Sequence, residues 1–167
     1  MSWFTHPKTN SQSLPELVSS ILYDERLFYH DFSQDLLKAR QEVIIDSPFI
    51  TLGRLKTLQP IFEKLVRNGV KVFVVTKHPN ELEEIRKEYT EEAIRYFEVL
   101  GVQVLLSEGH HRKLAMVDRK VLWEGSLNIL SQNQSREYMR RIDSKRLTEE
   151  LFKFLHYDQV EYFRHKN

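Results

Sequence analysis

Four side chains in the C-terminal half of the chain are spaced for chemistry on a phosphodiester. In the stretch HRKLAMVD, His111 and Lys113 share one face of an expected strand, because side chains alternate along a strand. An imidazole can attack phosphorus while the neighbouring ammonium offsets charge on the non-bridging oxygens. Ser126 ends the expected return strand, and Asn128 follows at the start of a short helix, where an anion can be held. Together these residues predict nucleophilic attack on a phosphate.

The spacing of these residues also matches a known signature. It resembles the HxKxxxxD…GSxN motif of the phospholipase D superfamily, with the defining positions filled by His111, Lys113, Asp118, Gly125, Ser126 and Asn128. The phrasing WEGSLNILS…REYMRR is similar to the nuclease-type branch of that superfamily, which includes domains attached to helicases and restriction systems. Glu137, nine residues after Asn128, stands where single-motif members often have an acid.

The resemblance implies a two-step reaction that needs no metal ion or other cofactor. The His of one motif forms a phosphohistidine, and the His of a second motif protonates the leaving alcohol and then activates water. Carried over to this chain, Lys113 and Asn128 clamp the phosphate with help from Ser126. Glu137 holds the tautomer of a His ring, and Asp118 supports the motif without acting as a base.

The sequence contains one complete motif. His6-Pro7-Lys8 has the HxK spacing, but Ser13 stands where the Asp belongs and no GSxN follows. The second His must therefore come from another chain. A two-fold homodimer with His111 near its axis supplies it, and such dimers are the commonest oligomers.

Several of these residues also have purely structural explanations. Asp118 is a common residue type at the opening of a turn, and Ser126 or Asn128 can cap a short helix. His110 points away from His111 on a strand, and we expect it to be structural.

The basic residues after Asn128 leave two alternatives open. Glu137 lies among Arg136, Arg140 and Arg141, so an exposed ion pair is one explanation for it. The arginines either form a solvated face or contact phosphates that flank the scissile one. We expect Arg136 and Arg140 to contact phosphates, which would make binding fall with salt.

The composition fits one soluble domain. The chain has 167 residues, of which 41% are hydrophobic and 29% charged, and its formal charge is +1. Cysteine is absent, which excludes disulfides and thiolate catalysis and suits the cytoplasm. The apolar runs are too short for a membrane span, so we expect no membrane association.

Hydrophobic periodicity predicts an α/β fold, with a mixed, mostly parallel sheet flanked by helices on both faces. We expect residues 1–27 to form a leader and a helix packing on the domain, and residues 28–167 to form the catalytic domain. The expected helices cover residues 14–23, 28–40, 54–68 and 80–100, with a short one near 127 and a last one from 144. In the helix over 80–100, we expect Asn80 to cap the first turn and Leu82, Ile85, Tyr89 and Phe97 to be buried. The expected strands cover residues 42–47, 70–76 and 102–107, followed by a hairpin at 113–126 that turns at 119–120.

We therefore expect a homodimeric endonuclease that cleaves nucleic acid, DNA in preference to RNA. A larger restriction or helicase assembly is the further partner that the resemblance suggests. A phospholipase that cleaves a lipid such as cardiolipin would use the same chemistry, but the sequence shows no membrane anchor and no basic amphipathic helix. A nucleic-acid-binding module that has lost catalysis is a further alternative. The intact motif argues against it.

Overall fold

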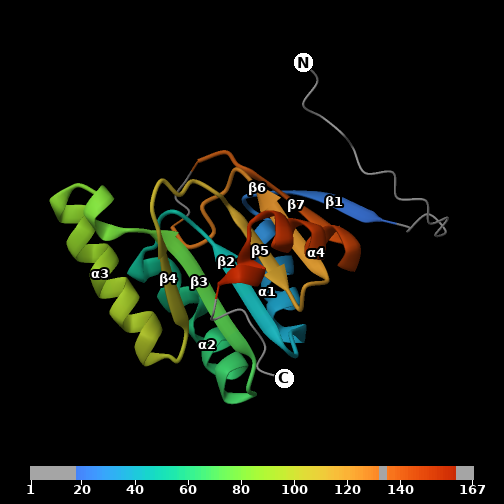
Figure 1. Ribbon diagram of the computed structural model, residues 1–167, viewed down its shortest axis with the longest axis horizontal. Coiled ribbons are helices and arrows are strands. Elements are labelled where there is room, and N and C mark those ends of the chain that lie inside the picture. The colour runs from blue at the N-terminus through green and yellow to red at the C-terminus, as the bar shows by residue number, and fades with distance from the viewer. Residues whose placement is uncertain (1–17, 132–134, 161–167) are drawn as a thin grey trace.

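One seven-stranded sheet organises the chain. The computed structural model describes residues 18–131 and 135–160 (Figure 1). Strand order across the sheet is β1-β7-β6-β5-β2-β3-β4. The strands are β1 (Ser19–Asp24), β2 (Glu42–Asp46), β3 (Lys71–Lys77), β4 (Gln103–Ser107), β5 (Leu114–Val117), β6 (Val121–Gly125) and β7 (Tyr138–Asp143). The helices are α1 (Phe28–Lys38), α2 (Leu52–Arg67), α3 (Glu84–Val99) and α4 (Lys145–Phe154), with 3₁₀ turns η1 (Pro79–Glu81) and η2 (Tyr157–Gln159).

The sheet is mixed, as predicted, but it is not mostly parallel. Strand β2 pairs in parallel with β3, and β3 pairs in parallel with β4. All other neighbours in the described sheet are antiparallel. The physical reason is local, since β5 and β6 form a tight hairpin while β7 and β1 extend that hairpin antiparallel. The prediction of an α/β fold with a mixed sheet is confirmed, and the predicted excess of parallel pairing is wrong.

Helices cover both faces of this sheet. On one face, side chains of α1, α2 and α3 such as Phe32, Phe62 and Phe97 join the larger buried cluster. On the other face, Phe152 of α4 packs into a smaller buried cluster with Phe73 of β3. Figure 1 shows α4 in front of the sheet and α1 behind it. Because helices cover both faces, successive apolar side chains of the middle strands are buried on opposite sides of the sheet, and neither side of these strands faces solvent.

Most of the predicted elements are present with small shifts at their ends. Helix α2 begins where the Thr51 hydroxyl accepts a hydrogen bond from the Arg54 amide at 3.4 Å, and it ends before Gly69, whose φ is +77°. Ser144 caps α4 by accepting a hydrogen bond from the Leu147 amide at 3.2 Å. These local signals explain why the element boundaries were visible in the sequence.

The predicted helix over residues 14–23 is wrong where the structure describes it. Residues 19–24 form β1, an edge strand that pairs antiparallel with β7. Residues 14–17 of that prediction lie outside the described residues. Most side chains of β1 are exposed, so its position depends on backbone hydrogen bonds to β7 and not on a buried face. The leader's described end is therefore part of the sheet.

The start and the buried face of α3 also differ from the prediction. The chain forms η1 at the place where we expected Asn80 to cap a long helix, and His78 Nδ1 accepts the Asn80 amide hydrogen bond at 3.2 Å. Helix α3 begins at Glu84 and buries Thr90, Ala93 and Phe97. The predicted core residues Ile85 and Tyr89 are instead 71% and 62% exposed.

Candidate active site

Apart from Asp118, the predicted catalytic residues gather at one end of the sheet. The parallel strands β2 and β3 have their carboxyl ends there, β5 begins there, and β6 ends there. Loops that follow the carboxyl ends of parallel strands are the usual place for a site in an α/β fold. The two halves of the motif lie at the start of β5 and at the end of β6. These strand ends, Leu114 and Gly125, are eleven residues apart in the sequence, and the hairpin places them in adjacent positions.

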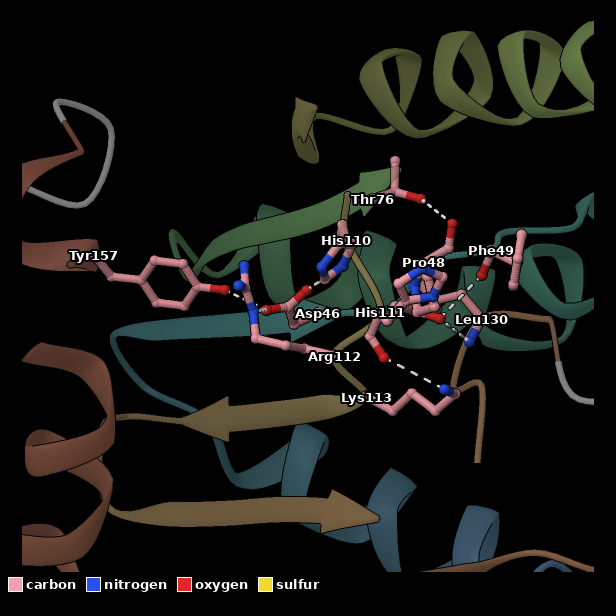
Figure 2. Close-up of polar contacts among 11 residues, drawn as sticks. Asp46, Pro48, Phe49, Thr76, His110, His111, Arg112, Lys113, Leu130 and Tyr157 are labelled. Atoms are coloured by element: carbon pink, nitrogen blue, oxygen red, sulfur yellow. Dashed lines mark hydrogen bonds and ion pairs between the residues drawn. The ribbon is translucent and has the colours of Figure 1, made fainter. Parts of the chain in front are cut away.

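His111 and Lys113 lie in the segment just before β5, because this strand begins at Leu114 and not at Lys113 as expected. The Lys113 ammonium donates a hydrogen bond to the His111 carbonyl oxygen at 3.3 Å, and the Lys113 carbonyl accepts from the Gly125 amide at 3.2 Å. The second bond continues the β5–β6 ladder past its last strand residue. His111 is exposed, and Figure 2 shows it on the other side of the chain from His110. An imidazole and an ammonium thus lie together at an open surface.

His110 and Arg112 alternate with the predicted catalytic pair and converge on the carboxylate of Asp46 (Figure 2). The imidazole of His110 contacts one carboxylate oxygen of Asp46, and the Arg112 guanidinium binds the other oxygen at 2.9 Å. The Tyr157 hydroxyl of η2 donates a short hydrogen bond to that second oxygen. Asp46 and the His110 side chain are fully buried. The expectation of a structural role for His110 agrees with this position.

The carboxylate of Asp46 also affects the ionisation of its neighbours. Burial, followed by the charge of Asp46, raises the pKa of Tyr157 far above its ordinary value. Burial opposes the charge of Arg112, but the hydrogen bond and charge of Asp46 raise its pKa. Tyr157 is therefore a neutral donor and Arg112 a permanent cation. The contacts of His110 and Arg112 with Asp46 fix the backbone on both sides of His111.

Replacing Asp46 by asparagine should destabilise the protein and loosen the segment that carries His111. Asparagine has one acceptor oxygen in place of two and no charge, so the buried Tyr157 hydroxyl or Arg112 loses its charged partner, and we expect the free energy of unfolding to fall by about 2 kcal/mol. Urea denaturation measures this loss, and amide hydrogen exchange should show faster opening of residues 108–113.

Asp143→Asn is the matched control for that substitution. It removes only a partly exposed pair with Arg141 at 3.7 Å, and Arg141 keeps its buried partner Asp35 at 2.6 Å. Such a pair contributes at most about 1 kcal/mol. Equal stability of Asp46→Asn and Asp143→Asn would show that the cluster does not hold the segment.

Gly125 permits the close approach of β6 and β7 beside the site. A Cβ atom built on Gly125 would lie 2.2 Å from the Tyr138 carbonyl oxygen and 2.9 Å from the Met139 Cα. Both are backbone atoms that cannot move without displacing β7. The glycine of the motif is therefore required here by contact with the neighbouring strand.

The segment after Gly125 is a turn, so the short helix predicted near residue 127 is absent from the described residues. The turn is closed by a hydrogen bond from the Ser131 amide to the Asn128 carbonyl at 3.1 Å. The amide of Leu130 donates to the Ser47 hydroxyl at 3.2 Å, and its carbonyl accepts from the Thr51 amide at 2.9 Å. The turn is thereby attached to the loop that follows β2.

Asn128 is held in place by its buried neighbours. Leu127 and Ile129 are both fully buried, and the Tyr29 hydroxyl donates a 2.8 Å hydrogen bond to the Ile129 carbonyl. Asn128 Oδ1 is buried and has no hydrogen-bond partner among the residues that the structure describes. A buried amide oxygen without a donor is costly, which is typical of a site that waits for a ligand or water.

Ser126 and Glu137 form a pair across the ends of β6 and β7. The Ser126 hydroxyl donates a short hydrogen bond to the Glu137 carboxylate and accepts one from the Tyr138 amide at 3.2 Å. Glu137 also accepts from the Ser135 hydroxyl at 3.1 Å. The predicted hydrogen bond from a His ring to Glu137 is not among the contacts of the described chain. Ser126 does not cap a helix, because the described residues that follow it form a turn.

Asp118 lies at the far end of β5 from the predicted nucleophile. Its carboxylate accepts hydrogen bonds from the amides of Arg40, Gln41 and Glu42 at 2.9, 2.8 and 3.0 Å. Asp118 follows Lys113 by five positions of extended chain, which is roughly 16 Å. Asp118 also has a φ of 51°, as the tight β5–β6 turn requires. These hydrogen bonds anchor the turn of the hairpin. The position agrees with the expected role of Asp118, which is to support the motif and not to act as a base.

The predicted phosphate contacts Arg136 and Arg140 are both exposed. Arg140 donates to the Ser20 hydroxyl at 3.0 Å and borders a groove that also contains Lys113 and Arg112. The groove has a volume of about 490 Å³ and continues past Tyr138 to Phe154 at the end of α4. Arg136 does not line it. The structure thus brings Arg140, but not Arg136, into one groove with the predicted clamp residue Lys113.

Sequence reasoning missed Asp46 and Tyr157, although an Asp at the end of the buried run EVIID was a signal for Asp46. Within the described part of the chain, no group of three or more His, Asp or Glu side chains is placed to hold a metal ion. The arrangement offers one imidazole, one ammonium and one amide at the same end of the sheet. Groups of these kinds can bind a phosphate and attack it.

The family comparison agrees with the motif. A model of the family described as "Cardiolipin synthase, PLD-like domain" matches residues 32–158, which is more than half of the chain. No curated protein sequence matches the chain.

Solved structures share the fold at low sequence identity. NucT from Helicobacter pylori is 17% identical over 82% of this chain and 92% of that chain, with a TM-score of 0.66. Nuc from Salmonella typhimurium, described as a phospholipase D family member, is 16% identical over 82% of this chain and 91% of its own, with a TM-score of 0.65. Phosphatidylserine synthase from Haemophilus influenzae Rd KW20 is 15% identical over 87% of this chain but 39% of its own, also with a TM-score of 0.65.

Proposed function

Because the chain belongs to the phospholipase D superfamily of phosphodiesterases, we propose that it is an endonuclease that cleaves nucleic acid, DNA in preference to RNA. The observation that carries the proposal is that the β5–β6 hairpin places His111 and Lys113 beside Gly125, three residues before Asn128, at one end of the sheet. A groove lined by Lys113, Arg112 and Arg140 leads away from this point and suits a chain of phosphates.

The proposed reaction has two steps. His111 of one protomer attacks phosphorus, which forms a P–N bond and breaks the bond to the leaving oxygen. The partner's His111 gives that oxygen its proton. The same imidazole then takes a proton from water, whose oxygen attacks phosphorus and breaks the P–N bond. No step of this scheme uses a metal ion.

The remaining site residues have distinct proposed roles. Lys113 and the Asn128 amide stabilise the charge that develops on the non-bridging oxygens. Glu137 already accepts hydrogen bonds from Ser126 and Ser135, so its carboxylate is fixed and can orient a His ring across the dimer. Arg136 and Arg140 contact flanking phosphates.

The dimer in this proposal forms through the face that carries α4. One chain supplies one His111, so its site is incomplete without a second copy. Phe154, at the end of α4, is 76% exposed and lines the same groove as Lys113. A second copy packed against Phe154 would cover this apolar surface and bring its own His111 toward the groove.

A phospholipid is the second candidate substrate, because the description of the matching family names cardiolipin synthase. In the described residues, no helix is long and apolar enough to cross a membrane. The arginines beside Lys113 favour the nucleic acid.

We place the enzyme in the cytoplasm, consistent with a sequence that has no cysteine.

One set of assays tests the proposed function. Plasmid DNA, a single-stranded oligonucleotide and cardiolipin-containing liposomes are incubated with the protein, each with and without EDTA. We expect cleavage of the DNA substrates to persist in EDTA. Cleavage that requires a divalent cation would refute the mechanism, and hydrolysis of the liposomes alone would refute the choice of substrate.

A further inference from the structure

We propose that a cleft beside Asn128 binds one unpaired nucleobase of the substrate strand, so that the enzyme acts on single-stranded or locally opened nucleic acid. The inference rests on the proposed function, because it states where the strand lies as it leaves the scissile phosphate. It concerns residues of α3 that the catalytic motif does not include.

The cleft lies between α3 and the two loops that hold the site. Its volume is about 410 Å³, which is in the range of pockets that hold a small ligand and is too small for a duplex. Its lining includes Phe49 from the loop after β2, Leu82 just after η1, Arg86 and Tyr89 from α3, and Asn128 and Ser131 from the turn after β6. The cleft therefore opens directly beside the phosphate clamp.

The lining combines the groups that bind a base. Tyr89 is 62% exposed although it lies one residue before the buried Thr90, so its ring is available at the surface. Phe49 is half-buried on the opposite loop. Aromatic rings in a groove that carries cations are the usual platform for unpaired bases, because every base has a π-face. Bases inside a duplex are already stacked and cannot reach such a ring.

Polar groups of the cleft suit the edge and the phosphate of the same nucleotide. Asn128 Oδ1 is buried without a partner among the described residues and can accept a hydrogen bond from a base, either from an amino group or from a ring N–H such as that of thymine. Arg86 lies one helical turn before Tyr89 and is exposed. Its guanidinium can bind the next phosphate or stack beside the base. An acyl chain would leave both of these groups unsatisfied.

The test measures binding in the His111→Ala background, which removes turnover. The probe is a single-stranded oligothymidine in which one abasic position is moved along the strand, so that a base is removed while each phosphate stays. We expect one position at which loss of the base weakens binding roughly tenfold. Tyr89→Ala should weaken binding of the intact strand by a similar factor and abolish the effect at that position.

Two variants serve as controls. Tyr89→Phe keeps the ring and should keep the effect of the abasic position. Ile85→Ala removes an exposed side chain that is 71% accessible on the same helix but does not line the cleft, and it should bind like the parent protein.

The outcomes separate this inference from the proposed function. If no abasic position matters, or if Tyr89→Ala responds to the same position as its parent, the cleft does not bind a base. The proposed function would still stand if the wild-type protein cuts DNA in EDTA. Conversely, a wild type that binds through Tyr89 but cuts no nucleic acid would refute the function alone.

Discussion

Replacing His111 by alanine is expected to lower the rate of DNA cleavage by roughly a thousandfold or more. In the proposed scheme the substitution removes the nucleophile from one protomer and the acid from the other. The neighbouring imidazole of His110 cannot take its place, because it is buried against Asp46. A plasmid-nicking assay with and without EDTA measures the effect.

The same substitution should leave the fold and the dimer intact, because His111 is exposed and its side chain is not part of the buried Asp46 cluster. His30→Ala is the matched control, since it removes an exposed histidine on α1. The control should cut DNA at the wild-type rate. If His111→Ala cuts as fast as His30→Ala, the assignment of the nucleophile is wrong.

Replacing Phe154 by glutamate is expected to convert the dimer to a monomer and to remove activity together with it. The side chain is 76% exposed at the end of α4, beside Lys113 in the groove. A charge placed in the centre of an apolar contact is costly to bury, so the protomers should separate. Analytical ultracentrifugation gives the oligomeric state, and the nicking assay gives the activity of the same samples.

Val99→Glu is the control for this second prediction. Val99 is 86% exposed on α3, on the other face of the sheet from α4, and it changes from an apolar to an acidic side chain in the same way. It should remain dimeric and active. A Phe154→Glu protein that is monomeric and still cuts DNA would show that one chain suffices.

The middle of the fold was predictable because its signals are local. Strands β2 and β3 are β-branched runs that end in recognisable loops, and α2 and α4 have capping residues at their first turns. The core positions Phe28, Phe32 and Leu36 of α1 recur at helical spacing and are all fully buried. Each of these features is visible within one turn or one strand of sequence.

The edge of the sheet was not predictable in the same way. Strand β1 has hardly any buried side chain, so no period of two or of 3.6 marks it. Strand β7 contains Arg140 and Arg141, and its polarity hides that Arg141 is held by the buried carboxylate of Asp35 at 2.6 Å. The two strands pair with each other across more than a hundred residues of sequence. Only the tertiary structure reveals that pairing.

The site also has a part that the local sequence predicts and a part that it does not. The motif predicted His111, Lys113, Ser126 and Asn128 because its spacing is set by one hairpin. The buried cluster that supports them joins Asp46 to Arg112 and Tyr157, which are distant in sequence. Nothing in the local sequence links these positions. The predicted helix at Asn128 failed because Leu127, Ile129 and Leu130 are all buried, which an irregular turn achieves and one helical face does not.

Mixed dimers give the most direct test of two imidazoles acting on one phosphate. Wild-type protein is mixed with increasing His111→Ala protein under conditions that exchange subunits, and the rate of DNA cleavage in EDTA is measured at constant total protein. If both copies of His111 are needed, the rate will fall as the square of the wild-type fraction, because only dimers with two wild-type chains cut. A rate that falls in simple proportion to the wild-type fraction would contradict the shared site.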